Sequence, residues 1–259
     1  AAQVHGGMFP SCYEQPLDHF DEDTRVGRQR QVLGDGSSYT GQWLWDDRDG
    51  EGEQLFPDGS TYRGNFQKNK ASGHGTFEYG EGSVYVGNWN DSQAEGTGTC
   101  VRHDGSIFKG EWEAGMQHGN GVLTFKDGTK YTGQYVRGVK SGIGNFVIES
   151  SNFQDATGGC SYEGAFENDT FHGEGVFTWG DGRKYEGQWK EGMMNGKGTF
   201  TFRDGRKYTG EYKNNLKHGN GIMEWKNGRK VQAEFENGKQ LGDGTEIQKR
   251  SLWSLIGSS

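Results

Sequence analysis

The chain has 259 residues, of which 47 are glycine, with a net charge of −8 and a mean hydropathy of −0.97. A low aliphatic content with excess charge is typical of disordered proteins, but 8 Trp, 11 Tyr and 15 Phe are far more aromatic residues than disordered chains carry. No stretch approaches the roughly 18 apolar residues that a membrane-spanning helix needs. The composition therefore predicts a folded chain with an aromatic rather than an aliphatic core.

The first 30 residues contain an acidic run from Asp18 to Asp23 and no repeated pattern. We interpret residues 1–30 as a tail that is irregular or becomes ordered on a partner. The chain begins at Ala1 without an initiator Met, so an alternative is that a targeting peptide has been removed and that the protein resides inside an organelle. Its 3 cysteines are too few, and odd in number, for a disulfide framework.

A repeat of 23 residues begins at Tyr39 and continues almost to the end of the chain. Within each unit, positions 3, 12 and 14 are glycine and positions 1 and 5 are aromatic. An Asp-Gly or similar pair closes most units. A ninth, degenerate unit begins at Val231. The eight full units begin at Tyr39, Tyr62, Tyr85, Phe108, Tyr131, Tyr162, Tyr185 and Tyr208.

Each unit predicts a β-hairpin. Positions 1, 3 and 5 alternate along a first strand, and positions 12, 14, 16 and 18 alternate along a second, so that each strand has one enriched face. The Asp-Gly pair is a tight-turn signal that leads into the next unit. Glycine inside a strand often marks a close approach of another group. We therefore expect the rings to lie over glycine backbone.

Three departures from the repeat carry predictions. The fifth unit has eight extra residues within 149–160, which predict a polar loop or, alternatively, a partner-contacting projection with Phe153. In the third unit, Cys100 and Arg102 replace two aromatic residues and predict a locally thin core. Residues 31–247 are thus the repeat array. Residues 248–259 are a capping segment, in which the spacing of Leu252 and Leu255 fits a short helix over the last sheet edge.

The segment from Tyr185 to Phe200, Tyr-Glu-Gly-Gln-Trp-Lys-Glu-Gly-Met-Met-Asn-Gly-Lys-Gly-Thr-Phe, resembles the MORN (membrane occupation and recognition nexus) repeat. The resemblance covers about residues 39–244. It implies an all-β fold, an elongated and twisted single-layer antiparallel meander of about nine β-hairpins. At about 4.8 Å per strand, this sheet would be very roughly 85 Å long.

Catalytic and metal chemistry is not indicated. His118, His172 and His218 all occupy position 11, which we assign to the hairpin turns of alternate units. Alternate units lie about 19 Å apart, too far for shared ligation of one metal ion. A strand rather than a helix follows each Gly-x-Gly, so these glycines do not indicate a phosphate site. We predict no enzymatic activity and no cofactor.

Two sets of side chains are candidates for binding. The larger rings gather in units six to eight, and exposed aromatic patches commonly mark interaction sites. The predicted partner-binding residues are Trp179, Trp189, Phe200, Phe202, Tyr212 and Trp225. The second set is basic and occupies positions 22 and 23 of three units, where it could meet an anionic partner such as phosphoinositide head groups. These residues, the basic rim, are Arg183, Lys184, Arg206, Lys207, Arg229 and Lys230.

The alternative for the basic rim is that it pairs with neighbouring carboxylates and keeps an edge soluble. Nucleic acid is disfavoured by the net negative charge. Resemblance to MORN proteins implies a non-catalytic scaffold that contacts other protein subunits in a cytoplasmic, cytoskeletal or ciliary assembly, such as an axonemal radial spoke. The alternatives are an adaptor for anionic membranes and an accessory subunit of an organellar membrane complex.

Overall fold

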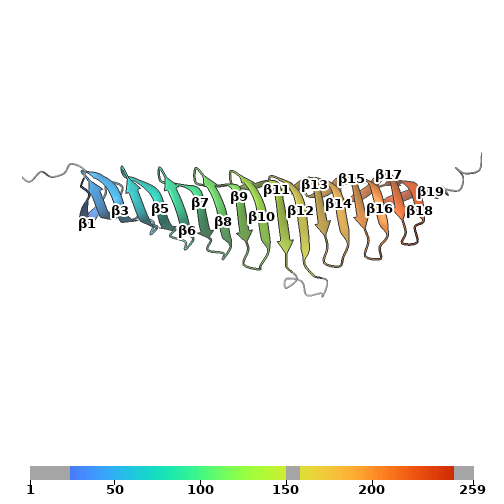
Figure 1. The fold of residues 1–259 in the computed structure, drawn as a ribbon, viewed down its shortest axis with the longest axis horizontal. Helices are drawn as coiled ribbons and strands as arrows, with labels where there is room; N and C mark the ends of the chain where they lie inside the picture. The colour runs from blue at the N-terminus through green and yellow to red at the C-terminus, as the bar shows by residue number, and fades with distance from the viewer. Residues whose placement is uncertain (1–23, 150–157, 248–259) are drawn as a thin grey trace, which may run out of the picture.

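The computed structural model describes residues 24–149 and 158–247. Within these ranges, 19 strands form one antiparallel sheet, and each strand pairs with the next one along the chain. The sheet is a long, narrow ribbon with no second layer against it (Figure 1). The predicted elongated, single-layer, all-β meander is confirmed.

Two strands come from each repeat, preceded by one additional strand. The strands are β1 (Val26–Val32), β2 (Ser38–Leu44), β3 (Asp47–Leu55), β4 (Thr61–Gln67), β5 (Lys70–Glu78), β6 (Val84–Asn90), β7 (Gln93–Val101), β8 (Ile107–Glu113), β9 (Met116–Thr124), β10 (Lys130–Val136), β11 (Val139–Ile148), β12 (Cys160–Glu167), β13 (Thr170–Thr178), β14 (Lys184–Lys190), β15 (Met193–Thr201), β16 (Lys207–Lys213), β17 (Leu216–Glu224), β18 (Lys230–Glu236) and β19 (Lys239–Glu246).

The turn inside each hairpin is shorter than the sequence predicted. It consists of positions 7 and 8, and both have positive φ in, for example, Asn168 (47°) and Asp169 (64°), as a type I′ turn requires. The second strand consequently begins by position 9. The assignment of His118, His172 and His218 to turns is wrong, because position 11 already lies inside β9, β13 and β17.

The Asp-Gly turns between units are confirmed. In the first of the full units, the Gly59 N–H donates to the Phe56 carbonyl at 3.1 Å, and the Asp58 carboxylate accepts the Ser60 N–H at 2.9 Å. Gly59 has a φ of 86°, a conformation that glycine adopts without steric cost. The ring at position 18 lies one residue beyond the end of the second strand, so it flanks this turn and does not continue the strand.

The glycines at positions 3 and 14 pair with each other across the whole sheet. They form an unbroken row from Gly41 to Gly221, with Ala233 as the next partner. A Cβ atom on Gly64 would lie 2.6 Å from the Gly75 Cα and 2.7 Å from the Tyr62 Oη. The row is glycine because the tyrosine ring covers the backbone there, as the sequence predicted.

The rings form a continuous ladder beside this row. Each position-1 ring meets the position-5 ring of its own unit and that of the next unit edge to face. Tyr39, for example, lies 5.3 Å from Trp43 and 4.9 Å from Phe66 between centroids. The same contacts continue without interruption to Phe235. Edge-to-face geometry is the favoured arrangement of ring pairs, and this ladder serves as the core.

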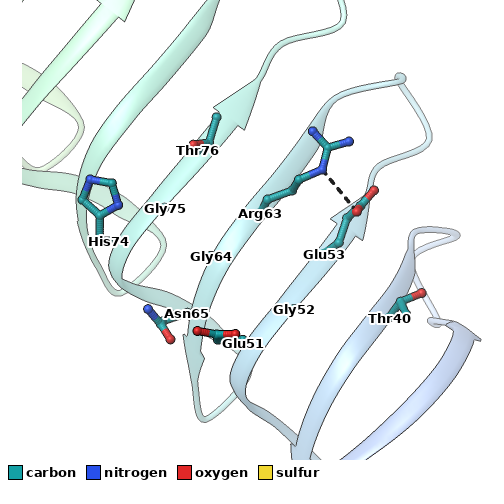
Figure 2. A pocket seen from close by; sticks show the side chains of 10 residues that line it. All are labelled: Thr40, Glu51, Gly52, Glu53, Arg63, Gly64, Asn65, His74, Gly75 and Thr76. Carbon is teal, nitrogen blue, oxygen red and sulfur yellow. Dashed lines mark ion pairs between the residues drawn. The ribbon is translucent and has the colours of Figure 1, made fainter.

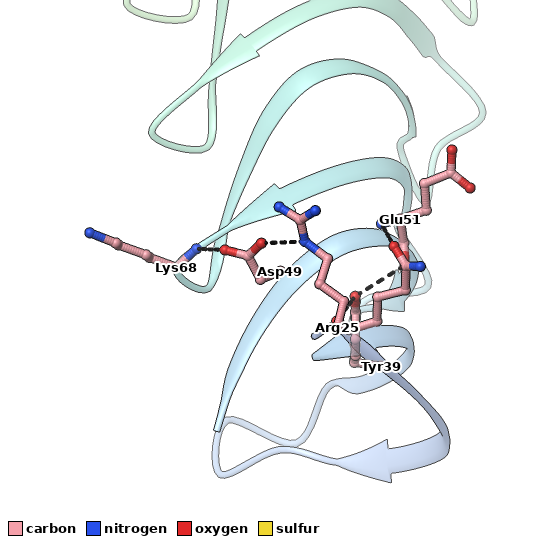
Figure 3. Close-up of polar contacts among 6 residues, drawn as sticks. Arg25, Tyr39, Asp49, Glu51 and Lys68 are labelled. Carbon is pink, nitrogen blue, oxygen red and sulfur yellow. Dashed lines mark hydrogen bonds and ion pairs between the residues drawn. The ribbon is translucent and has the colours of Figure 1, made fainter. Parts of the chain in front are cut away.

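A β-bulge follows position 3 in the first strand of each unit. In the first unit, the Tyr39 hydroxyl donates to the Gln42 carbonyl at 2.9 Å, and the Gln42 side-chain oxygen accepts the Glu51 N–H at 2.8 Å (Figure 3). Both residues thus satisfy backbone groups at the bulge. The tyrosine hydroxyl makes the same bond in every unit that begins with tyrosine.

The ends of the sheet differ from its middle. Strand β1 begins at Val26, inside the segment expected to be a tail, and all its side chains are exposed, so no hydrophobic pattern marks it in the sequence. The Arg25 Nε contacts the buried Asp49 carboxylate at 2.7 Å, which attaches the chain before β1 to the first unit (Figure 3). The remaining predictions for the tail, for Phe153 and for a helix in 248–259 fall outside the described residues.

The ring ladder continues through the third unit, where Tyr85 contacts both Trp89 and Trp112 edge to face. The buried residues on either side of that unit nevertheless group into two clusters. One cluster is built on Tyr39, Tyr62 and Phe66, and the other extends from Phe108 to Phe235. Between them, the Cys100 side chain is only partly buried and pairs in register with Tyr85 and Phe108. A thiol stands at the position that is Phe in four other units, so one ring fewer packs beside the ladder here.

Candidate functional site

The six predicted partner-binding rings divide into two groups. Trp189 and Tyr212 occupy position 5, and only 6% and 5% of their surface is exposed, because they belong to the ring ladder. The Trp189 Nε1 also donates to the Gly175 carbonyl at 3.1 Å. Trp179, Phe200, Phe202 and Trp225 occupy positions 16 and 18 and are only partly buried. Only this second group offers aromatic surface to a partner.

The arginines of the basic rim pack against the rings at position 18. Arg183 lies over Trp179, Arg206 over Phe202 and Arg229 over Trp225, with 5.3, 5.3 and 5.1 Å from guanidinium carbon to ring centroid. The pairing follows from the turn, since the N–H of position 18 donates to the carbonyl of position 22 and brings both residues to the same place. Rings and guanidinium groups thus form one composite surface at the turns that connect these units.

Five of the six basic rim residues make ion pairs. Arg183 and Arg206 contact the aspartates of their own turns, Asp181 and Asp204, both at 2.7 Å. The hydrogen bonds from each arginine's side chain and backbone hold the pKa of these carboxyl groups below the usual range. Lys184, Arg229 and Lys230 pair with Glu186, Glu246 and Glu224. Within the described residues, Lys207 alone of the six has no ion pair.

An apolar hollow of about 230 Å³ opens beside these rings, between β15 and β17. Three of the predicted residues, Phe200, Phe202 and Tyr212, line it. The other main contributors to the hollow, which were not predicted from the sequence, are Met194, Leu216 and Lys217. They occupy positions 9 and 10, where residue type changes from unit to unit, so the repeat pattern itself contained no signal for them.

A second hollow lies on the opposite face, where side chains at positions 2, 4, 13 and 15 point. It is an open trough of about 640 Å³ over β2 to β5, with polar residues around it (Figure 2). Its one arginine, Arg63, is held by Glu53 at 3.2 Å and Glu78 at 2.9 Å. A neighbouring hollow shares His74 and extends the trough to β9. The trough is mixed in charge and already internally paired.

The histidines at position 11 have local partners. The Nδ1 atoms of His118 and His172 lie 3.1 and 3.0 Å from the carboxylates of Glu113 and Glu167 at position 6 of the same hairpins. In the eighth unit position 6 is Lys213, and the buried Nδ1 of His218 has no hydrogen-bond partner. In residues 24–149 and 158–247, no three or more His, Cys, Asp or Glu side chains are placed to hold a metal ion.

Over the same described ranges, the structure contains no helix with the length and hydropathy needed to cross a bilayer.

Three of the solved structures that resemble the chain are domains of CPAP or Sas-4 proteins. The TCP10 domain of Danio rerio CPAP is 13% identical, with a TM-score of 0.43, and the match covers 85% of this chain and 100% of that domain. The TCP domain of Drosophila melanogaster SAS-4 (dCPAP), in complex with a proline-rich motif of Ana2, is 12% identical, with a TM-score of 0.30 and coverages of 89% and 100%. The TCP10c domain of Drosophila melanogaster Sas-4 is 13% identical, with a TM-score of 0.30 and coverages of 82% and 100%.

No curated protein matches the chain in sequence. The model of the MORN repeat, in contrast, matches eight times and in register with the hairpins described above. The matched segments are residues 39–61, 62–84, 85–107, 108–130, 131–152, 162–182, 185–205 and 208–228. The glycine row, the ring ladder and these eight matches lead to the same conclusion, that the chain belongs to the MORN repeat family.

Proposed function

We propose that the protein is a non-catalytic scaffold subunit that binds other protein subunits through the ring-bearing face of units six to eight. The observation that carries this proposal is the group of partly exposed rings at positions 16 and 18, namely Trp179, Phe200, Phe202 and Trp225. They stand on a sheet whose strands are all paired to their neighbours, so binding needs little ordering of the backbone. Trp and Tyr side chains are favoured anchors at such interfaces.

The assembly that we propose is cytoskeletal or ciliary, for which the support is the MORN repeat itself. Cross-linking mass spectrometry on the native assembly, purified at endogenous level, tests the proposal. We expect partner cross-links at lysines of the ring-bearing region, including Lys184, Lys207 and Lys213. Partner cross-links confined to residues 1–38 and 247–259 would contradict it, because the repeat array would then be only a spacer.

A second candidate function is binding of anionic membranes by the basic rim. The observation that favours it is exposure, since the side chains of Arg183, Arg206 and Arg229 are 43%, 45% and 53% accessible. Their ion pairs with Asp and Glu weaken the case, because a head group would have to displace those carboxylates.

Liposome flotation distinguishes the two functions. If the basic rim binds lipid, charge reversal at Arg183, Lys184, Arg206 and Lys207 should abolish binding to anionic vesicles, and salt should weaken it. Binding to neutral vesicles that survives high salt would reject the mechanism.

A further inference from the structure

Lys217 occupies an unusual place on the ring-bearing face. Its ammonium nitrogen lies 4.7 Å from the ring centroid of Tyr208, 5.1 Å from that of Phe202 and 5.5 Å from that of Phe235. Burial, together with the nearby Arg206 charge, lowers the pKa of Lys217. Among the described residues, the one hydrogen-bond contact of its ammonium group is with the Met223 Sδ at 3.7 Å. Within residues 24–149 and 158–247, no carboxylate forms an ion pair with it.

The same position of other units shows what is missing. Position 10 is also basic in the fifth unit, where Lys140 donates to the Asp169 Oδ1 from both its backbone N–H, at 2.9 Å, and its Nζ, at 3.3 Å. In the first unit, Arg48 contacts Asn69 in the same way. Asp169 and Asn69 both occupy position 8 of the following unit. A basic residue at position 10 is therefore normally paired with a side-chain oxygen from the next hairpin turn.

For Lys217, the residue at that place is Gly238, which has no side chain. The Gly238 N–H still donates to the Lys217 carbonyl at 2.9 Å, so the turn has the same backbone contact as in the other units. A Cβ atom on Gly238 would meet only Leu216, at 3.5 Å. The hollow of about 230 Å³ thus extends to Gly238, the place at which Asp169 of the sixth unit stands beside Lys140.

The rest of the hollow is mainly apolar; its one amide, Asn215, accepts the Met194 N–H with its side-chain oxygen at 2.8 Å. Phe200, Phe202 and Met194 are partly exposed, and 46% of the Leu216 surface is accessible. A desolvated cation beside exposed apolar side chains favours a ligand that carries both a carboxylate and an apolar group. In an extended chain, residues i and i+2 point to the same side, so one short segment can supply both.

We infer that this hollow binds an extended segment of a partner protein in which a leucine-sized apolar residue and an Asp or Glu are two positions apart. The carboxylate pairs with Lys217 in the place that Asp169 occupies beside Lys140, and the apolar side chain contacts Phe200, Phe202 and Met194. This inference rests on the proposed scaffold function and names the chemistry of its partner.

The test uses the full chain and immobilised twelve-residue peptides with a Ser/Gly background and a central Leu-x-Glu. Matched peptides carry Leu-x-Gln or Ser-x-Glu. We expect Leu-x-Glu peptides to bind, and the Gln counterparts to bind about 10- to 100-fold more weakly, the range that follows from losing a hydrogen bond between charged groups. Equal binding of the Glu and Gln peptides, or no binding of either, would overturn the inference.

Variants locate the contact. Lys217→Met should remove the preference for Glu over Gln, whereas Lys140→Met, at the same position of the fifth unit, should leave it unchanged. Gly238→Asp should place a carboxylate beside Lys217 within the chain and block the Leu-x-Glu peptides. Gly238 has a φ of 83°, which is unfavourable for a residue with a side chain, although Asp169 adopts 64° at the same position. The stability of the Gly238→Asp variant should therefore be measured by thermal unfolding alongside the binding test. If Gly238→Asp does not fold, Lys217→Met still decides.

Two further outcomes are decisive. Lys217→Met that binds the peptides as the wild type does would contradict the inference. The inference would also be contradicted if phosphatidylserine vesicles bound the protein in a Lys217-dependent way while no peptide bound. The anion that Lys217 recognises would then be a lipid. Neither outcome affects the scaffold proposal, which fails only if native cross-links avoid the ring-bearing region.

Discussion

At the scale of single residues, the tyrosine at position 1 has two roles. Its ring covers the glycine row, and its hydroxyl donates to the carbonyl that the bulge at position 4 leaves free. A larger residue in the glycine row would displace the ring and so break the hydrogen bond as well. Seven of the eight full units combine both roles in a tyrosine, whereas Phe108 in the fourth unit covers the glycine row alone.

This dependence predicts the effect of adding a single methyl group. A Cβ atom on Gly144 would lie 2.6 Å from both the Oη and the Cε2 of Tyr131. We expect Gly144→Ala to lower the free energy of unfolding by about 1–3 kcal/mol, the usual cost of overpacking. Gly27→Ala is the matched control, because nothing lies within 4 Å of a Cβ there. Its effect in urea unfolding should stay within about 0.5 kcal/mol; equal effects would contradict the packing argument.

The same tyrosines predict a loss of stability in alkali. Burial raises the pKa of Tyr39, Tyr85, Tyr131 and Tyr208 from 10.0 to about 12. Between these values the unfolded chain loses its tyrosine protons while the folded chain keeps them, so stability falls as pH rises above 10 and is unaffected by these groups below it. Thermal unfolding followed with tyrosinate absorbance should show both changes together. Tyrosinate forming near pH 10 in a chain that stays folded would show that the hydroxyls are accessible.

At the scale of the hairpin, much could be predicted from the sequence. The period of 23 residues, the faces of the strands, the Asp-Gly turns and the packing of rings on glycine all follow from residue types that recur in every unit. Two features were out of reach. The bulge places backbone groups at position 4, where the side chain differs among units, and the short turn at positions 7 and 8 is formed by residues as different as Asn168 and Glu191.

The candidate site was predicted only in part, for a related reason. Phe200 and Phe202 stand at recurring aromatic positions and were found, whereas Met194, Leu216 and Lys217 stand at variable ones. Trp189 and Tyr212 were chosen for their size, although position 5 is part of the ladder in every unit and is buried by it. A partner surface on a repeat protein depends on the positions that vary between units. A periodic pattern identifies only the packing that recurs in every unit.

The ring that is missing beside the ladder in the third unit leads to an element-scale prediction. Cys100 stands at position 16, where Phe77, Phe146, Phe177 and Phe200 stand in other units, and burial raises the pKa of its thiol. Cys100→Phe should add a ring beside the ladder and raise the free energy of unfolding by about 0.5–2 kcal/mol, as changes that fill core space do. Hydrogen exchange should slow most in β6 to β8. Slower exchange at a distant site such as β15 but not in β6 to β8 would contradict the explanation.

At the scale of the whole molecule, each unit contacts only its neighbours. Backbone hydrogen bonds join the turn of one hairpin to position 10 of the hairpin before it, as from the Asn69 N–H to the Arg48 carbonyl at 3.0 Å. Stability in such arrays is approximately the sum of unit and interface contributions. The two terminal strands, β1 and β19, have side chains that are exposed throughout, so the ends of the ribbon contribute least to it.

The single layer predicts a shape that scattering can measure. The sheet of 19 strands should be about 85 Å long at about 4.8 Å per strand, and a rod of that length has a radius of gyration near 25 Å. A compact globule of the same number of residues would have a radius of gyration of about 18 Å. Small-angle X-ray scattering on the isolated chain should give the larger value. Because the exposed edges of β1 and β19 could pair between molecules and lengthen the particle, the forward scattering must match one chain across a concentration series. A monomer at or below the compact value would mean that the ribbon folds back on itself, and the ring-bearing face would then be covered by the protein's own sheet.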